Sequence, residues 1–243
     1  ALYFQLPVRD DVWRINFAPG TAPAVPGFGN VDAGPDYNRW RGYGWLDATG
    51  RVVFGRWPRD EDDSWESRDN LNVIKRRGPD DLAQGFATGS ATFAVDIDPG
   101  TYEVWVLSGD AGHLEYTPRD AYHILVEGEP VYIHEITSEE YIAQFETPPT
   151  TDQLTHDDIW EQSIQPRFQW SRAVADVTDG QLTIQIDGQR RDNSLDNFLG
   201  DYAHTEARSG PAQRYSGAMN ALVVTPYTAG ADRGAQEVAS IDA

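Results

Sequence analysis

Short runs of alternating apolar and polar residues, each ending at a turn signal, constrain the fold of this chain most strongly. One run, 91–97, places Phe93, Val95 and Ile97 on one face. Asp98-Pro99-Gly100 follows as a turn signal, and a second run begins at once over 101–107. Alternation with period two indicates β-strands with one buried face, and Pro-Gly pairs terminate strands. These two runs predict a β-hairpin.

The same pattern recurs to the end of the sequence. Residues 121–126 and 131–136 flank the turn signal Glu127-Gly128-Glu129-Pro130 and predict a second hairpin. Further strands are predicted over 13–17, 168–177, 181–186 and 218–224, whereas amphipathic helix is rare and best represented by 138–145. Many short strands at this spacing are typical of a sandwich or barrel. We therefore predict an all-β sandwich with long loops, mainly over 22–45, 55–86 and 187–217.

The ends of the sequence differ from the middle. Residues 1–5 resemble the remnant of a protease-cleavable tag, so we exclude them from the fold. Residues 6–227 are expected to form one domain, because 243 residues suffice for one large sandwich. After Thr228 the composition turns to Ala, Gly, Asp and Ser, which predicts a tail or linker over 228–243 to further domains of a larger protein.

Composition narrows the range of partners. The formal net charge is −20, and a strongly acidic domain repels nucleic acids and anionic membranes. No apolar run approaches the length of a membrane helix, which argues against membrane insertion. The chain has no cysteine, so disulfides, thiolate metal sites and cysteine catalysis are excluded. Known motifs of α/β-hydrolases, P-loops and dinucleotide-binding sites are also absent, and no catalytic residues are predicted.

Several segments, in a fixed order, resemble a known module. Arg41-Gly42-Tyr43-Gly44-Trp45 matches an "R-G-Y-G-W/F" segment, and 92–102 matches "T-F-x-V-x-L-P-x-G-T-Y". The remaining matches are weaker and lie at 15–20, 26–28, 68–71, 108–110, 126–128, 178–182 and 219–222. Together they resemble the galactose-binding-like, or malectin-like, jelly-roll β-sandwich that accompanies rhamnogalacturonan esterases and polysaccharide lyases. The resemblance implies a secreted or cell-surface carbohydrate-binding module whose partner is a polysaccharide or oligosaccharide.

Tryptophans outside the alternating strands are the candidate binding residues. Sugars stack on aromatic rings, while Arg, Asp and Asn bind their hydroxyls. Trp57 and Trp65 occur in a charged segment with no strand periodicity, so they are predicted to contact the ligand together with Arg68, Asp69 and, in a second insertion, Trp160. The alternative is that these rings pack over loops. Trp45, behind a Gly-rich turn, is instead predicted to lie in the core.

Metal and catalytic alternatives rest on fewer residues. Asp60-Glu61-Asp62-Asp63 offers oxygen ligands but lacks a regular calcium-loop spacing, so a structural calcium is left open at unassigned ligands. His123 and His134 could face each other across the second hairpin. A polysaccharide lyase built on Tyr122, His123 and Arg119 is a minor alternative. A structural or adhesive surface module without sugar binding is the main one.

Overall fold

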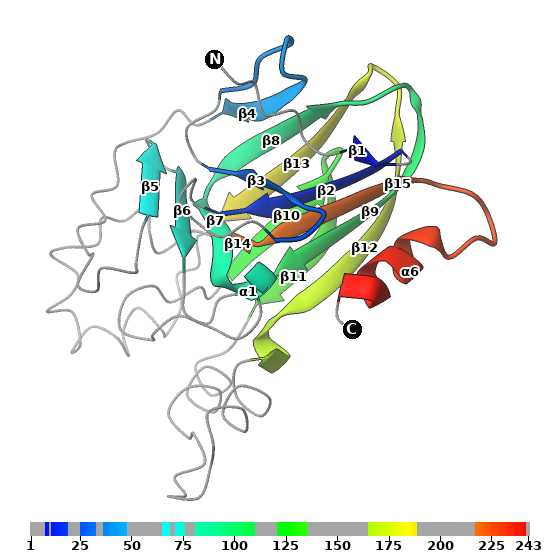
Figure 1. Cartoon of the computed structure of the whole chain (residues 1–243). Coiled ribbons are helices and arrows are strands. Elements are labelled where there is room, and N and C mark those ends of the chain that lie inside the picture. The colour runs from blue at the N-terminus through cyan, green and yellow to red at the C-terminus, as the bar shows by residue number, and fades with distance from the viewer. Residues whose placement is uncertain are drawn as a thin grey trace, which may run out of the picture.

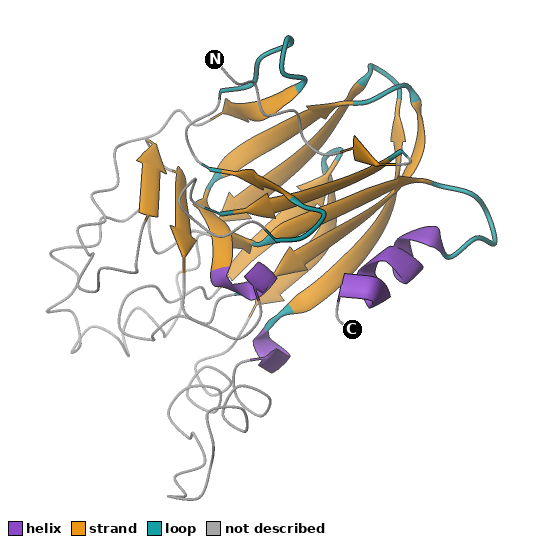
Figure 2. Cartoon of the chain, viewed as in Figure 1, coloured by secondary structure: helices purple, strands orange, loops and turns teal. Residues whose placement is uncertain are grey.

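The chain folds into a β-sandwich, as predicted (Figures 1 and 2). The structure is a computed structural model. It describes residues 8–9, 11–18, 25–32, 36–47, 65–68, 71–75, 81–109, 121–135, 165–188 and 217–241. Strands dominate this part of the chain, and helices are short and peripheral (Figure 2). No helix among the described residues has the length and apolar character needed to cross a membrane.

The first layer is a sheet in the order β1-β2-β15-β9-β12, with β3 paired to β2. The bounds of its strands are β1 Val8–Arg9, β2 Val12–Phe17, β3 Gly29–Val31, β9 Gly100–Ser108, β12 Gln169–Val177 and β15 Ala221–Pro226. Apart from the parallel pair of β2 and β3, the ladders in this sheet are antiparallel.

The second layer is an antiparallel sheet in the order β11-β10-β13-β8-β4. The bounds of its strands are β4 Tyr43–Asp47, β8 Ala91–Asp96, β10 Ala121–Val126, β11 Glu129–Glu135 and β13 Gln181–Gly188. A smaller sheet, in the order β14-β7-β6-β5, lies beside the sandwich (Figure 1). It consists of β5 Trp65–Arg68, β6 Leu71–Lys75, β7 Gly85–Gly89 and β14 Gly217–Met219, and α1 Asp81–Gln84 leads into β7.

The core lies between the two main layers and is filled from both by alternate strand residues. Phe17 of β2 packs against Trp45 of β4 and Phe93 of β8, with ring centroids 5.5 and 5.2 Å away. The Trp45 and Phe93 centroids are 5.1 Å apart. Trp45 is 1% exposed, so the prediction that it belongs to the core is confirmed.

The predicted hairpin over 91–107 is wrong in its pairing, although both strands exist. β8 pairs with β13 and β4, whereas β9 pairs with β15 and β12. The turn at Asp98-Pro99-Gly100 therefore carries the chain from one layer to the other. Tyr102 closes this turn by donating from its hydroxyl to the Asp98 carbonyl at 2.7 Å. A turn signal marks where a strand ends, but it does not determine which strand becomes its neighbour.

The second predicted hairpin is confirmed. β10 and β11 pair antiparallel around Glu127 and Gly128, whose φ angles are 51° and 81°. The register places His134 opposite Tyr122 and His123 opposite Ile133. His123 and His134 therefore do not face each other, and the expectation of such a pair is wrong.

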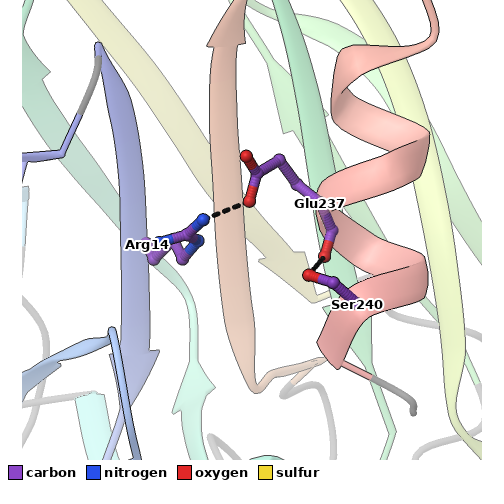
Figure 3. A network of polar contacts seen from close by, with 3 residues as sticks. All are labelled: Arg14, Glu237 and Ser240. Atoms are coloured by element: carbon purple, nitrogen blue, oxygen red, sulfur yellow. Dashed lines mark hydrogen bonds and ion pairs between the residues drawn. The ribbon is translucent and has the colours of Figure 1, made fainter.

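Part of the predicted tail is a helix that packs on the sandwich. α6, Arg233–Ile241, covers the outer face of the first sheet, where Val238 is 7% exposed (Figure 1). Glu237 of α6 forms an ion pair with Arg14 of β2, and its carbonyl accepts a hydrogen bond from Ser240 (Figure 3). The description as a tail or linker does not hold for 233–241. Only two large apolar residues in this segment, Val238 and Ile241, signalled the packing.

A glycine allows α6 to approach the sheet closely. A Cβ atom at Gly234 would lie 2.6 Å from Nε1 of Trp105 and 2.7 Å from Cδ of Glu103. Glu103, 2% exposed, accepts hydrogen bonds from Trp105 Nε1 at 2.9 Å and Arg172 Nε at 2.6 Å. The buried carboxylate is thus neutralised beneath the helix, which is how a charge is tolerated there.

The register gives the second sheet two different ends. At one end, Asp47, Ala121, Glu135 and Gly188 border segments 48–64, 110–120, 136–164 and 189–216, which lie outside the described residues. At the opposite end, the turn before β4 meets the end of β8, since Gly42 O accepts a hydrogen bond from Asp96 N at 2.7 Å. We call this the turn end of the sandwich.

Candidate functional site

A loop over Asp36–Gly42, before β4, forms the candidate site at the turn end. It runs back along β4: Asp36 bridges Trp45, Tyr37 N donates to Trp45 O at 2.9 Å, and Asn38 bridges Tyr43. The loop is therefore attached to the sheet at three consecutive residues. This attachment gives the residues that follow a defined position over the sheet edge.

Asn38 determines the shape of the turn. Its side-chain Oδ1 accepts a hydrogen bond from Trp40 N at 2.8 Å. Its carbonyl accepts hydrogen bonds from Arg41 N at 2.8 Å and Gly42 N at 2.9 Å. Gly42 completes the turn with a φ of 73°, which favours glycine. Asparagine commonly organises turns by bonding to the backbone two residues ahead, and here that contact holds the backbone of Trp40.

Tyr37 ties the loop to two further strands. Its hydroxyl donates to Oδ1 of Asp96 on β8 at 2.9 Å, and Nε2 of Gln181 on β13 donates to the same oxygen at 3.2 Å. The hydrogen bond to Asp96 raises the pKa of the Tyr37 phenol above its ordinary value. The loop is thus fixed through both backbone and side-chain contacts.

We expect Tyr37→Phe to lower the free energy of unfolding by about 1 kcal/mol, the usual net value of one hydrogen bond. A group with a raised pKa stabilises the fold below its ordinary pKa, and this contribution is lost as pH rises through the folded pKa. The difference from wild type should therefore stay constant from about pH 6 to 9, begin to fall near the ordinary tyrosine pKa of about 10, and be lost as pH rises through the raised folded pKa. Urea unfolding across that pH range measures it. An unchanged stability at pH 7 would show that the bond does not hold the loop.

Trp40 is the most exposed large apolar side chain among the described residues, at 82%. The guanidinium carbon of Arg39 lies 4.9 Å from its ring centroid. Arg41 stacks in the same way on Tyr43, at 5.5 Å, and donates to the Asp36 carbonyl at 3.5 Å. Tyr43 is 7% exposed, and its burial raises the pKa of its phenol. Chemically, the loop offers an aromatic face beside two sets of guanidinium N–H donors.

The binding residues predicted from sequence are not brought to this site. Trp57, Asp69 and Trp160 lie outside the described residues. Trp65 and Arg68 are the first and last residues of β5, where they pair with Ile74 and Leu71 of β6, and their side chains are outside the described part. Trp40 was not predicted. The signal was available in its position between two arginines within an aromatic loop, since neither strand periodicity nor the glycine motif requires a tryptophan there.

The suggested lyase residues are not arranged as a catalytic group. Tyr122 is 2% exposed on the core side of β10, with its hydroxyl 2.8 Å from Ser108 Oγ. His123 follows it on the opposite face, with Nε2 3.5 Å from a carboxylate oxygen of Glu135. Arg119 lies outside the described residues. Adjacent residues of a strand point to opposite faces, so Tyr122 and His123 cannot serve one substrate.

Metal-ligating side chains do not gather in groups of three or more within the described ranges. The acidic run 60–63, considered for calcium, lies outside those ranges. Because calcium favours six to eight oxygen ligands, the described residues do not assign a calcium site.

No protein-family model and no curated protein matches the chain. Among solved structures, the Bacillus subtilis protein YXIM is similar with a TM-score of 0.46 and 15% identity, over 89% of this chain and 40% of its own. The plant receptor-like kinase FER gives a TM-score of 0.42 and 8% identity over 90% and 42% of the two chains. A calcium-binding mutant of Bacteroides uniformis β-glucuronidase 2 gives 0.39 and 10% over 91% and 18%. This chain spans less than half the length of each.

Proposed function

We propose that the domain is a non-catalytic carbohydrate-binding module of a secreted or cell-surface multidomain protein, and that Trp40 is a stacking platform for its ligand. The observation that carries the proposal is an 82% exposed tryptophan on a loop held by backbone and side-chain hydrogen bonds. The ordered sequence resemblance to carbohydrate-binding sandwich modules supports it.

A fixed loop favours binding because the ring is presented before the ligand arrives. Ordering a flexible side chain on binding costs free energy, and a preformed contact avoids part of that cost. The backbone bonds of Asn38 and the Tyr37–Asp96 contact supply such preorganisation. Tryptophan also contributes a large rigid surface with only two side-chain torsions to fix.

The binding residues predicted from the sequence, whose side chains the structure does not describe, are also part of the proposal. Trp57, Trp65, Arg68, Asp69 and Trp160 are proposed as further ligand contacts, and a structural calcium is proposed at unassigned ligands. Binding measured before and after treatment with a chelator tests the calcium. Tryptophan-to-alanine substitutions at 57, 65 and 160 test the additional rings.

The test of the function is binding of the whole chain to immobilised neutral and acidic polysaccharides, followed by calorimetry on retained polymers. We expect Trp40→Ala to weaken binding by roughly 5- to 150-fold, equivalent to the 1–3 kcal/mol expected for a central anchor. Ile133→Ala is the matched control, because Ile133 is 59% exposed but lies on β11 at the other edge of the sheet. It should bind as wild type does.

Two results would contradict the proposal. The first is that no polysaccharide in a broad panel is retained. The second is retention that Trp40→Ala leaves unchanged while thermal unfolding shows both proteins to be folded. In the second case the ligand would bind elsewhere on the domain.

A further inference from the structure

We propose that the Trp40 loop selects an anionic sugar, one whose ring carries a carboxylate or a sulfate, through Arg39 and Arg41. This inference rests on the proposed carbohydrate-binding function and adds the chemical class of the ligand. It starts from the charge of the loop, which differs from that of the chain as a whole.

The two arginines make no ion pair with a carboxylate among the residues that the structure describes. Elsewhere in the same part of the chain, Arg14 pairs with Glu237 and Arg172 pairs with Glu103. The chain has 39 acidic residues and only 19 Lys and Arg, so acidic partners are plentiful. Two neighbouring arginines without such partners, on either side of an exposed tryptophan, leave local positive charge available to a ligand.

Both guanidinium groups lie over aromatic rings. Arg39 lies over Trp40 at 4.9 Å and Arg41 over Tyr43 at 5.5 Å, each distance measured from Cζ to the ring centroid. A guanidinium over a ring interacts with it through its charge, and N–H donors that point away from the ring can bind a ligand. Those donors suit the oxygens of a carboxylate or sulfate, which accept paired hydrogen bonds.

One acidic side chain beneath the loop is already engaged. One oxygen of Asp96, beneath the loop, accepts hydrogen bonds from Tyr37 and Gln181. Of the two nearby loop arginines, Arg41 reaches only the backbone carbonyl of Asp36 among the contacts described, at a long 3.5 Å. An anion on the ligand would therefore meet arginine donors that form no ion pair with a carboxylate among the described residues.

The net charge of −20 opposes this selection only at long range. Charges in solution are screened over about 8 Å at physiological ionic strength, so contacts at the loop dominate at that salt concentration. The ligand is accordingly a short anionic stretch at the loop rather than a long polyanion lying over the whole surface. Measurements should therefore use oligosaccharides at about 0.15 M salt.

The experiment compares matched ligands by calorimetry on the whole chain. The probes are oligogalacturonate and oligoglucuronate, their methyl esters, which keep the ring but lose the charge, and sulfated and unsulfated oligogalactans. We expect at least one anionic probe to bind about tenfold or more tightly than its neutral counterpart, as for hydrogen bonds to a charged group. The uronate and sulfate arms show which oxyanion is preferred.

Single substitutions show which residues cause the preference for the anionic saccharide. Arg39→Gln and Arg41→Gln should each weaken binding of the anionic probe more than binding of its neutral counterpart, so that most of the anionic preference is lost. Arg233→Gln changes the net charge by the same amount on α6, over the other layer, and should leave the preference intact. Thermal unfolding verifies that each variant is folded.

The other possible outcomes distinguish a failure of the anionic selection from a failure of the proposed carbohydrate binding. Equal binding of charged and neutral probes overturns the anionic selection and leaves carbohydrate binding in place. A preference that survives both arginine substitutions assigns the anion to another site and also overturns the inference. Binding of no saccharide in this panel or in the polysaccharide panel overturns the proposed function itself.

Discussion

Trp45→Ala should lower the free energy of unfolding by about 3–5 kcal/mol, the usual cost of removing a large buried aromatic ring. The ring is 1% exposed between Phe17 and Phe93, and its Nε1 donates to the Asp32 carbonyl at 2.8 Å. The substitution leaves a cavity between the two layers and an acceptor without its donor. Urea unfolding followed by circular dichroism measures the loss.

Trp40→Ala is the matched control for this prediction, because it makes the same chemical change five residues earlier. Trp40 is 82% exposed, so its removal should change stability by less than about 0.5 kcal/mol. Similar losses in the two variants would contradict the assignment of one ring to the core and the other to the surface. A small loss for Trp45→Ala alone would contradict the packing of the sandwich at β4.

Gly44→Ala is expected to damage both the fold and the site. Gly44 has a φ of 145°, and a Cβ atom there would lie 2.4 Å from Tyr37 N and 2.6 Å from Asp36 C. Both contacts are with backbone, so the attached part of the loop must move away from β4. We expect a stability loss of roughly 1–3 kcal/mol from the strained backbone, and more from the clash. Binding of saccharide at Trp40 should be lost with it.

Gly128→Ala is the control that separates the effect of backbone strain at a positive φ from the effect of the clash with the loop. Gly128 also has a positive φ, 81°, but nothing lies within 4 Å of the added Cβ atom. Gly128→Ala should lower the free energy of unfolding by about 1 kcal/mol and leave saccharide binding unchanged. Unfolding curves and calorimetry on both variants test the prediction. Normal binding by Gly44→Ala would show that the contact between the loop and β4 does not position Trp40.

The alternating runs were predictable from sequence as strands, but β3, β4, β5 and β6 lie wholly or partly in segments that were predicted to be long loops. Of the two predicted hairpins, only the pairing of β10 with β11 is confirmed. Alternation over 91–97 and 181–186 reports one buried face, and that face is buried as expected. The turn at Asp98-Pro99-Gly100 was equally visible, yet it connects two layers rather than two paired strands. Pairing between layers depends on contacts distant in sequence, which a local pattern does not contain.

The candidate site at Trp40 was not predicted from the sequence. Residues 22–45 were expected only to form a long loop and the binding residues were placed in other segments, although Trp45 was correctly assigned to the core. Whether a tryptophan in a loop is buried depends on the bonds that turn the backbone, here those of Asn38 and Tyr37. Those bonds connect residues whose spacing alone gives no periodic signal.

The most direct test of the central claim is to observe the tryptophan indole N–H signals by NMR while a bound saccharide is added. If Trp40 contacts the saccharide, its indole signal, assigned with Trp40→Ala, shifts together with the backbone amides of residues 37–42. The indole of Trp45, bonded to the Asp32 carbonyl within the core, should serve as an unshifted internal reference. Saccharide binding that leaves Trp40 and residues 37–42 unperturbed, with shifts confined to other parts of the chain, would contradict the account.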